Sequence, residues 1–96
     1  MLPNVGDAIV LHAYRGASNP KTQRMLTADM MMVVRAVDPT EEGAIVTGQH
    51  IDWAGYIRKK REVYLRADCT VAWSYVDLAT AGIEIEQAVA AVRRKL

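Results

Sequence analysis

One stretch, Met30–Tyr56, constrains the fold of this chain more than any other. It contains two apolar runs rich in methionine and β-branched residues, 30–37 and 44–51, on either side of the polar segment 38–43. Two such runs separated by turn-forming residues are typical of a β-hairpin. Gly43 is predicted to leave the turn with a positive φ, which glycine adopts without strain. The rest of the chain is therefore expected to cover the apolar faces of this hairpin.

The first hairpin strand is apolar on both of its faces. Successive side chains of a strand point to opposite sides of the sheet, so the residues of this strand divide into two sets. One set is wholly apolar. The other set contains Arg35, and its apolar members need cover from another element. In the second hairpin strand Gly48 has no side chain and predicts a bulge or a bend. The first set is Met30, Met32, Val34 and Ala36, and the second is Met31, Val33, Arg35 and Val37.

Three further strands are predicted around the hairpin, with long connections between them. Residues 8–14 are interpreted as the first strand, 61–66 as the fourth and 70–76 as the fifth, because these runs are alternating or rich in β-branched residues. Residues 15–29 are predicted to form a long loop of small polar residues, and 53–60 a second connection.

Apolar residues recur at helical spacing near the C-terminus and predict a helix over 83–95. Acidic residues near its start and basic residues at its end suit the helix dipole, and Thr80 is a candidate cap. A helix this short is marginal alone in water, so it must dock. Its receptor is expected to be an open end of its own barrel or the same surface of a second chain, which would make a homodimer. The expected docking residues are Ile85, Val89, Val92 and Leu96.

Five short strands followed by one helix indicate a mainly β fold, either a small five-stranded barrel or a bent sheet with a C-terminal α-helix. One domain, 1–96, is expected, with the barrel over 5–76 and a helical tail over 77–96. The order of parts resembles that of Src-homology-3-like barrels: a strand, a long loop, a hairpin, a further loop and two closing strands. Signalling domains of that family carry an Ala-Leu-Tyr-Asp-Tyr motif after the first strand, where residues 11–15 here are Leu-His-Ala-Tyr-Arg. Only Tyr14 is suggestive of that motif, so the resemblance implies the architecture and not the family's proline-peptide groove.

The overall charge and the cysteine content narrow the class of protein. A formal net charge of +1 over 96 residues gives no global attraction to nucleic acid or to a membrane, so any charge argument must be local. The single cysteine, Cys69, excludes an intramolecular disulfide and fits a reducing, cytoplasmic compartment. The N-terminal residues do not resemble a signal peptide, and no apolar run is long enough to span a bilayer.

The sharpest local feature is the basic run 58–61, Arg-Lys-Lys-Arg, which lies among aromatic residues. Basic groups neutralise phosphates and aromatic rings stack on unpaired bases, so the pattern points to nucleic acid. The alternative is a solvated segment whose charges keep a sheet edge from aggregating. The candidate residues for binding nucleic acid or a protein partner are Trp53, Tyr56, Arg58, Lys59, Lys60, Arg61, Tyr64 and Arg66.

Recognisable catalytic and metal-binding motifs are missing from the sequence. The soft metal ligands are His12, His50 and Cys69, and their spacing matches no structural zinc site. Cys69 or Ser74 would need a base and an orienting group to act as a nucleophile, and no nucleophile-elbow or phosphate-loop motif occurs. We therefore expect no enzymatic activity, no metal and no cofactor.

The function that these observations favour is a small cytoplasmic, non-catalytic binding module with a protein partner. A small nucleic-acid-binding barrel that uses the region Trp53–Arg66 is the alternative. The richness in alanine, valine and arginine is similar to the style of small orphan proteins of actinobacteria and their phages. That similarity implies, as one form of the module, a phage accessory protein that acts on a host partner.

Overall fold

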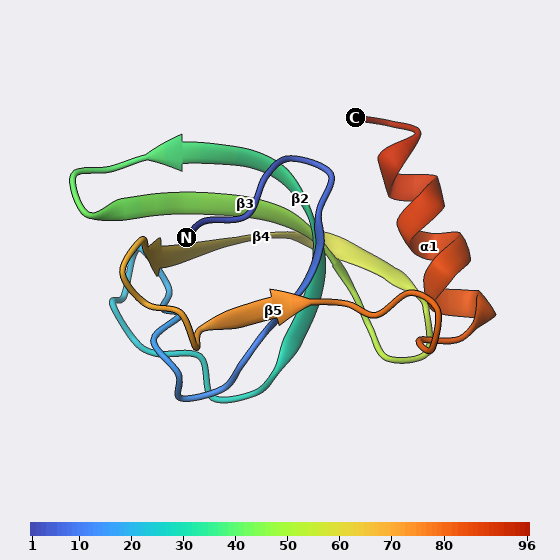
Figure 1. Cartoon of the computed structure of the whole chain (residues 1–96), viewed down its shortest axis with the longest axis horizontal. Coiled ribbons are helices and arrows are strands. Elements are labelled where there is room, and N and C mark those ends of the chain that lie inside the picture. Colours follow the sequence, from blue (N-terminus) through green and yellow to red (C-terminus); the bar gives the residue numbers. More distant parts are fainter.

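Five antiparallel strands form one sheet, and a C-terminal helix packs on it (Figure 1). The structure is a computed structural model that describes residues 1–96. The strand order is β4-β3-β2-β1-β5, so the mainly β fold with a C-terminal helix is confirmed, but the sheet is not closed, because β4 and β5 are its edges. The elements are β1 (Ala8–Leu11), β2 (Met30–Pro39), β3 (Gly43–Ile51), β4 (Ile57–Arg66), β5 (Trp73–Tyr75) and α1 (Ile83–Arg93).

The central strand β2 is buried on both faces. On one face its side chains join a cluster to which every strand contributes, and on the other face they meet α1. We call these the sheet cluster and the helix cluster. The sheet cluster consists of Ile9, Leu11, Ala17, Met30, Met32, Val34, Ala44, Val46, Val63, Leu65, Ala72 and Trp73. The helix cluster consists of Ala8, Met31, Val33, Ile51, Ile85, Ala88, Val89 and Val92.

A β-bulge at Arg35 reverses which side chains at the end of β2 point to each face of the sheet. Val34 pairs with Gly48 and Ala36 with Thr47, so Arg35 is the extra residue. One extra residue reverses the alternation of side chains beyond it. Val37 therefore packs against the sheet cluster, and the expectation that it shares a face with Met31 and Val33 is wrong.

Two glycines of β3 are required by close packing, and neither has a positive φ. A Cβ on Gly48 would lie 2.1 Å from Sδ and 2.9 Å from Cβ of Met32, which crosses β3 at this point. A Cβ on Gly43 would lie 2.0 Å from the carbonyl oxygen of Leu65 on β4. The positive φ predicted for Gly43 is thus wrong, and the close approach of β4 is the reason that glycine stands there.

The helix docks on the sheet of its own chain. Its apolar side covers the outer face of β1, β2 and β3, so its receptor is a face of its own sheet and not an open barrel end. Ile85, Val89 and Val92 are buried there, whereas Leu96 lies beyond the helix end with 49% of its surface exposed. Nε of Arg93 donates a hydrogen bond of 2.8 Å to the carbonyl of Gly6 and fastens the last turn.

The cap predicted at Thr80 is wrong, because the N-cap residue is Gly82, which has a φ of 99° and no side chain to cap with. Thr80 instead donates its hydroxyl to the carbonyl of Asp77 in the preceding turn. The positive φ of Gly82 turns the chain sharply before the first residue of α1, a conformation that L side chains rarely adopt.

Two strands are shorter than the sequence predicts and the other three are longer, β4 by the most. β1 stops at Leu11, and β5 pairs with it over only three residues. The predicted connection 53–60 is wrong in its second half, because Ile57–Lys60 form the start of β4. Ile57 pairs with Ile51 of β3, and this pairing extends β4 through a basic run whose side chains show no apolar alternation.

The segment 12–29 between β1 and β2 is a loop that folds back on itself. Ser18 forms one β-bridge with Met25 inside the loop and a second with Tyr64 of β4. Both backbone hydrogen bonds of the second bridge are present, at 3.2 and 2.8 Å. The loop thus joins the edge strand β4 from outside the sheet.

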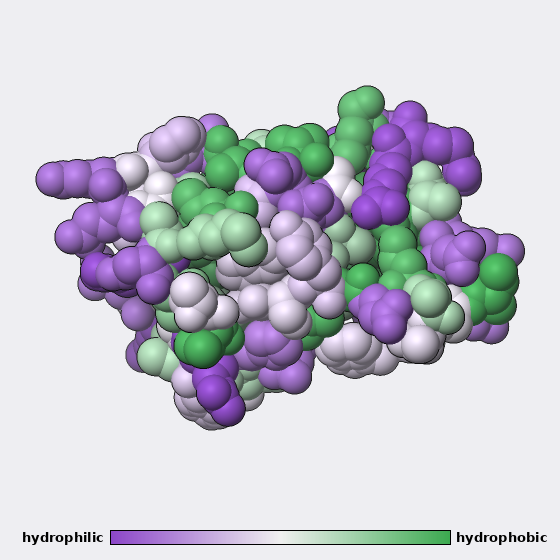
Figure 2. Space-filling view, in the orientation of Figure 1, coloured by the Kyte–Doolittle hydropathy of each residue, from purple (hydrophilic) through white to green (hydrophobic).

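Strongly polar residues gather at the two ends of the molecule in the face shown in Figure 2. One end carries the β2–β3 turn and the other carries α1 (Figure 1), and the surface between them mixes apolar residues with polar ones. No helix of this protein combines the length and the apolar character that crossing a membrane requires.

Gly48→Ala should destabilise the fold by about 1–3 kcal/mol, because the added methyl group overlaps the Met32 side chain. Chemical denaturation measures the change. Shortening the neighbour removes most of the overlap, so the same substitution should cost less in a Met32→Ala background. An equal cost in both backgrounds would contradict this account of Gly48.

Val89→Asp should destabilise the protein by at least about 3 kcal/mol, because it places a carboxylate with no partner at a site that is 1% exposed. Gln87→Asp, on the exposed side of the same helix, is the matched control. Thermal melting followed by circular dichroism compares the two variants, and sedimentation reports their mass. Equal melting temperatures would mean that α1 does not dock as described.

Candidate functional site

The first half of β4 is a free sheet edge. Tyr64 turns its backbone N–H and C=O away from β3, since both bond to Ser18. Backbone direction alternates along a strand, and the pairing with β3 is regular from Lys60 to Tyr64. The N–H and C=O groups of Lys60 and Glu62 therefore also point outward, where no strand of this chain pairs with them. This stretch, Ile57–Glu62, is called the β4 edge below, and all of its residues are exposed.

Asp52 organises the turn that leads into the β4 edge. Its Oδ1 accepts hydrogen bonds from the backbone N–H groups of Ala54 and Tyr56, each at 3.0 Å. Its Oδ2 accepts one from Nε of Arg58 at 2.9 Å, and the same oxygen lies 2.8 Å from a terminal nitrogen of that guanidinium. The Tyr56 N–H and the Arg58 side chain lower the pKa of the Asp52 carboxyl. The turn is therefore held by a charged group that is ionised at neutral pH.

Two aromatic side chains stand exposed on this turn. Trp53 and Tyr56 keep 59% and 67% of their surface in solvent. The guanidinium of Arg58 lies 5.9 Å from the centre of the Tyr56 ring, within the range of a cation–π contact. Gly55 has a positive φ, and a Cβ there would lie 2.7 Å from Cβ of Glu84, so the turn packs closely against the start of α1. The aromatic pair is consequently carried on a fixed support.

Three of the basic residues in the β4 edge have no carboxylate partner, namely Lys59, Lys60 and Arg61, because the ion pairs of this protein involve only Arg58 and Arg66. Side chains alternate along the strand, so Arg61 shares its face with buried Val63 while Lys60 lies on the opposite face. The basic run is thus divided between two faces and does not form one continuous patch.

The other two candidate residues lie at the far end of β4. Tyr64 is half-buried and lines a pocket with residues of the loop 12–29. Arg66 donates from Nε and a terminal nitrogen to the Asp68 carboxylate, both at 3.0 Å, and forms a 3.2 Å ion pair with Glu42. These carboxylates raise the pKa of Arg66, while Arg66 lowers the pKa of Asp68. Arg66 therefore fastens the β2–β3 turn to β4 and stands apart from the β4 edge.

His50 lies on β3 opposite an irregularity in β4. The β3–β4 register shifts between Gln49 and Ile51, and the Gln49 amide donates to the carbonyl of Arg58 at this point. Partial burial lowers the pKa of His50, and the neighbouring Arg61 lowers it further, while Asp52 opposes them. His50 and Arg61 line one pocket together with Asp29.

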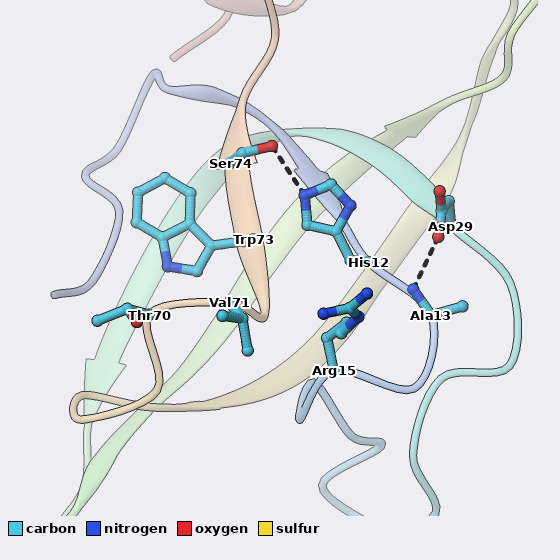
Figure 3. A pocket seen from close by; sticks show the side chains of 8 residues that line it. All are labelled: His12, Ala13, Arg15, Asp29, Thr70, Val71, Trp73 and Ser74. Carbon is cyan, nitrogen blue, oxygen red and sulfur yellow. Dashed lines mark hydrogen bonds between the residues drawn. The ribbon is translucent and has the colours of Figure 1, made fainter.

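A second group of polar side chains surrounds the end of β1 (Figure 3). Nε2 of His12 lies 2.8 Å from Oγ of Ser74, because the pairing of β1 with β5 brings together residues 62 positions apart. In a catalytic triad a carboxylate would hold the other ring nitrogen. Here no carboxylate lies within ion-pair distance of His12, and Oδ1 of Asp29 accepts the backbone N–H of Ala13 at 2.7 Å.

No local pattern in the sequence indicates the His12–Ser74 pair. The two residues come together only because β1 and β5 are neighbouring strands. No group of three or more His, Cys, Asp or Glu side chains is arranged to hold a metal ion. Comparison with models of known families, with curated proteins and with solved structures finds no match to this chain.

The lowered pKa of His50 predicts a loss of stability in mild acid. The unfolded chain takes up a proton near the ordinary His pKa of 6.5, whereas the folded protein resists it. Unfolding is therefore favoured as the pH falls through 6.5. The loss of stability is complete below the pKa that His50 has in the folded protein. Melting temperatures between pH 8 and pH 5 should fall modestly, and His50→Gln should reduce the fall.

Asp52 and Asp68 titrate below this window, because their pKa values are lowered from 3.8. An unchanged pH profile in His50→Gln would contradict the assignment to His50.

Proposed function

We propose that this protein is a small, non-catalytic binding module that captures an extended acidic segment of a partner protein on the β4 edge. The observation that supports it most is the free edge itself, a run of outward backbone groups next to exposed Trp53 and Tyr56. An extended peptide can add a strand to such an edge, with main-chain hydrogen bonds giving affinity and side chains giving specificity.

The charge of the edge indicates the sign of the partner. Lys59, Lys60 and Arg61 lack carboxylate partners, so a strand laid beside them meets an excess of positive charge. Opposite charges on neighbouring strands are stabilising and like charges are destabilising. A second copy of β4 would therefore be repelled, and an acidic strand would be attracted. The apolar side of α1, which suggested a homodimer, is already covered by the sheet of its own chain.

The architecture supports the further proposal that the domain is of the Src-homology-3-like type. The strand order β4-β3-β2-β1-β5 and the long loop between β1 and β2 agree with that plan. The bridge between Ser18 and Tyr64 brings the loop against β4 although the sheet itself is open. We place this binding in the cytoplasm, where Cys69 would remain the free thiol that donates to the carbonyl of Arg15.

Nucleic acid is the second candidate ligand of the same region. It is favoured by the exposure of Trp53 and Tyr56, whose rings are free to stack on unpaired bases beside Lys59 and Lys60. It is weakened by the ion pair that occupies Arg58 and by the division of the basic run between two faces. We therefore rank it below the acidic protein segment.

Lys60→Pro tests the main-chain contact. The N–H of Lys60 points outward, so proline removes one docking donor without removing a β3–β4 hydrogen bond. Lys60→Ala removes the charge and keeps the donor. For a designed peptide of alternating Glu and Val, we expect Lys60→Pro to weaken binding at least about tenfold more than Lys60→Ala does. Fluorescence anisotropy measures the affinities, and thermal melting verifies that both variants fold.

Two controls separate the candidate ligands. A peptide of alternating Lys and Val should not bind, and a single-stranded oligonucleotide should respond equally to Lys60→Pro and Lys60→Ala. Equal effects of the two variants on the acidic peptide would refute strand addition. Salt-sensitive oligonucleotide binding that Trp53→Ala abolishes, with no binding of the acidic peptide, would establish the nucleic-acid function instead.

A further inference from the structure

A pocket of about 470 Å³ opens between the loop 12–29 and the start of β5. β5 is one edge strand of the sheet, and β4 is the other. Figure 3 shows the Arg15 side chain directed toward its middle, below His12, with Ser74 above and Asp29 beyond Ala13. The eight lining residues are His12, Ala13, Arg15, Asp29, Thr70, Val71, Trp73 and Ser74.

The guanidinium of Arg15 forms no ion pair in this protein, although the carboxylate of Asp29 lines the same pocket. All ion pairs involve Arg58 or Arg66, so no carboxylate lies within ion-pair distance of the Arg15 guanidinium. The backbone of Arg15 is nevertheless held in place, because its carbonyl accepts a hydrogen bond from the Cys69 thiol at 3.3 Å. A guanidinium carries five N–H donors and has no acceptor, so this side chain offers only donors to the pocket.

One hydroxyl group lies near the histidine on the side of the pocket that Arg15 faces. Oγ of Ser74 lies 2.8 Å from Nε2 of His12. When the imidazole N–H donates to that oxygen, the Ser74 proton is left to point into the pocket. The second hydroxyl of the lining, that of Thr70, lies farther away, with Val71 between it and Arg15 (Figure 3). A guanidinium and a hydroxyl on one concave surface are donors that can bind an oxyanion, because charge-assisted hydrogen bonds are strong.

Asp29 sets the orientation of a ligand. One of its carboxylate oxygens accepts the backbone N–H of Ala13, and its negative charge remains at the end of the pocket away from Trp73. An anionic group would therefore be repelled from that end and would sit beside Arg15 and Ser74.

We propose that this pocket is a binding site for a small oxyanion, a phosphate, sulfate or carboxylate group, with Arg15 as its cation and Ser74 as its hydroxyl donor. Asp29 also lines the pocket of His50 and Arg61, but no residue of the β4 edge lines the anion pocket, and the proposal does not depend on the function proposed for that edge.

Titration of the whole chain with inorganic phosphate, sulfate and acetate, followed by amide NMR shifts, tests the proposal. We expect saturable shifts centred on His12, Arg15 and Ser74 for at least one of the anions. Arg15→Gln should weaken this binding at least about tenfold. Arg24→Gln removes the same charge from the same loop at a residue outside the pocket, and it should leave the affinity unchanged.

A gain-of-affinity variant makes the test independent of lost stability. Asp29→Asn keeps an acceptor for the Ala13 N–H and removes the negative charge, so it should tighten anion binding several-fold. Non-saturating shifts, shifts centred on Lys59 and Lys60, or equal losses in Arg15→Gln and Arg24→Gln would each overturn the site.

Discussion

The burial of β2 on both faces is the constraint on which the rest of the structure depends. A central strand with apolar side chains on both sides must be covered twice, and this short chain uses a different means for each face. The sheet curves around the sheet cluster and encloses it, and the loop 12–29 contributes Ala17. The helix cluster is covered by α1, whose buried residues lie against Met31, Val33 and Ile51. The helix is therefore an integral layer of the domain.

The sequence predicted those features that follow from local patterns. The hairpin, the helix, the number of strands and the double-sided burial of Met30–Val34 all come from periodicity and turn residues. Features set by a neighbouring strand were not predictable. Val37 changes face because of a bulge that exists only in the pairing with β3, and Gly43 is required by the approach of β4. The start of β4 was not predictable, because the four charged residues 58–61 show no alternation of apolar and polar side chains.

The candidate site shows the same division between local and distant information. Trp53, Tyr56 and Arg58 are near one another in the sequence, and in the structure Asp52 accepts hydrogen bonds from the backbone of Tyr56 and from the side chain of Arg58. Only the strand order shows that the start of β4 is a sheet edge and that Arg66 lies apart from it. The Arg15 pocket depends on the same information, because β1 and β5 are distant in sequence and adjacent in the sheet.

The three consecutive methionines of β2 have a consequence for oxidative chemistry. Met30, Met31 and Met32 are 7%, 1% and 0% exposed, whereas Met1 and Met25 are 69% and 45% exposed. A peroxide reagent oxidises an exposed thioether directly, but it reaches a buried one only when the surrounding structure opens. Because the buried three divide between the sheet cluster and the helix cluster, their sulfoxides would report the opening of each layer separately. The rate of methionine oxidation thus measures how often each half of the core opens.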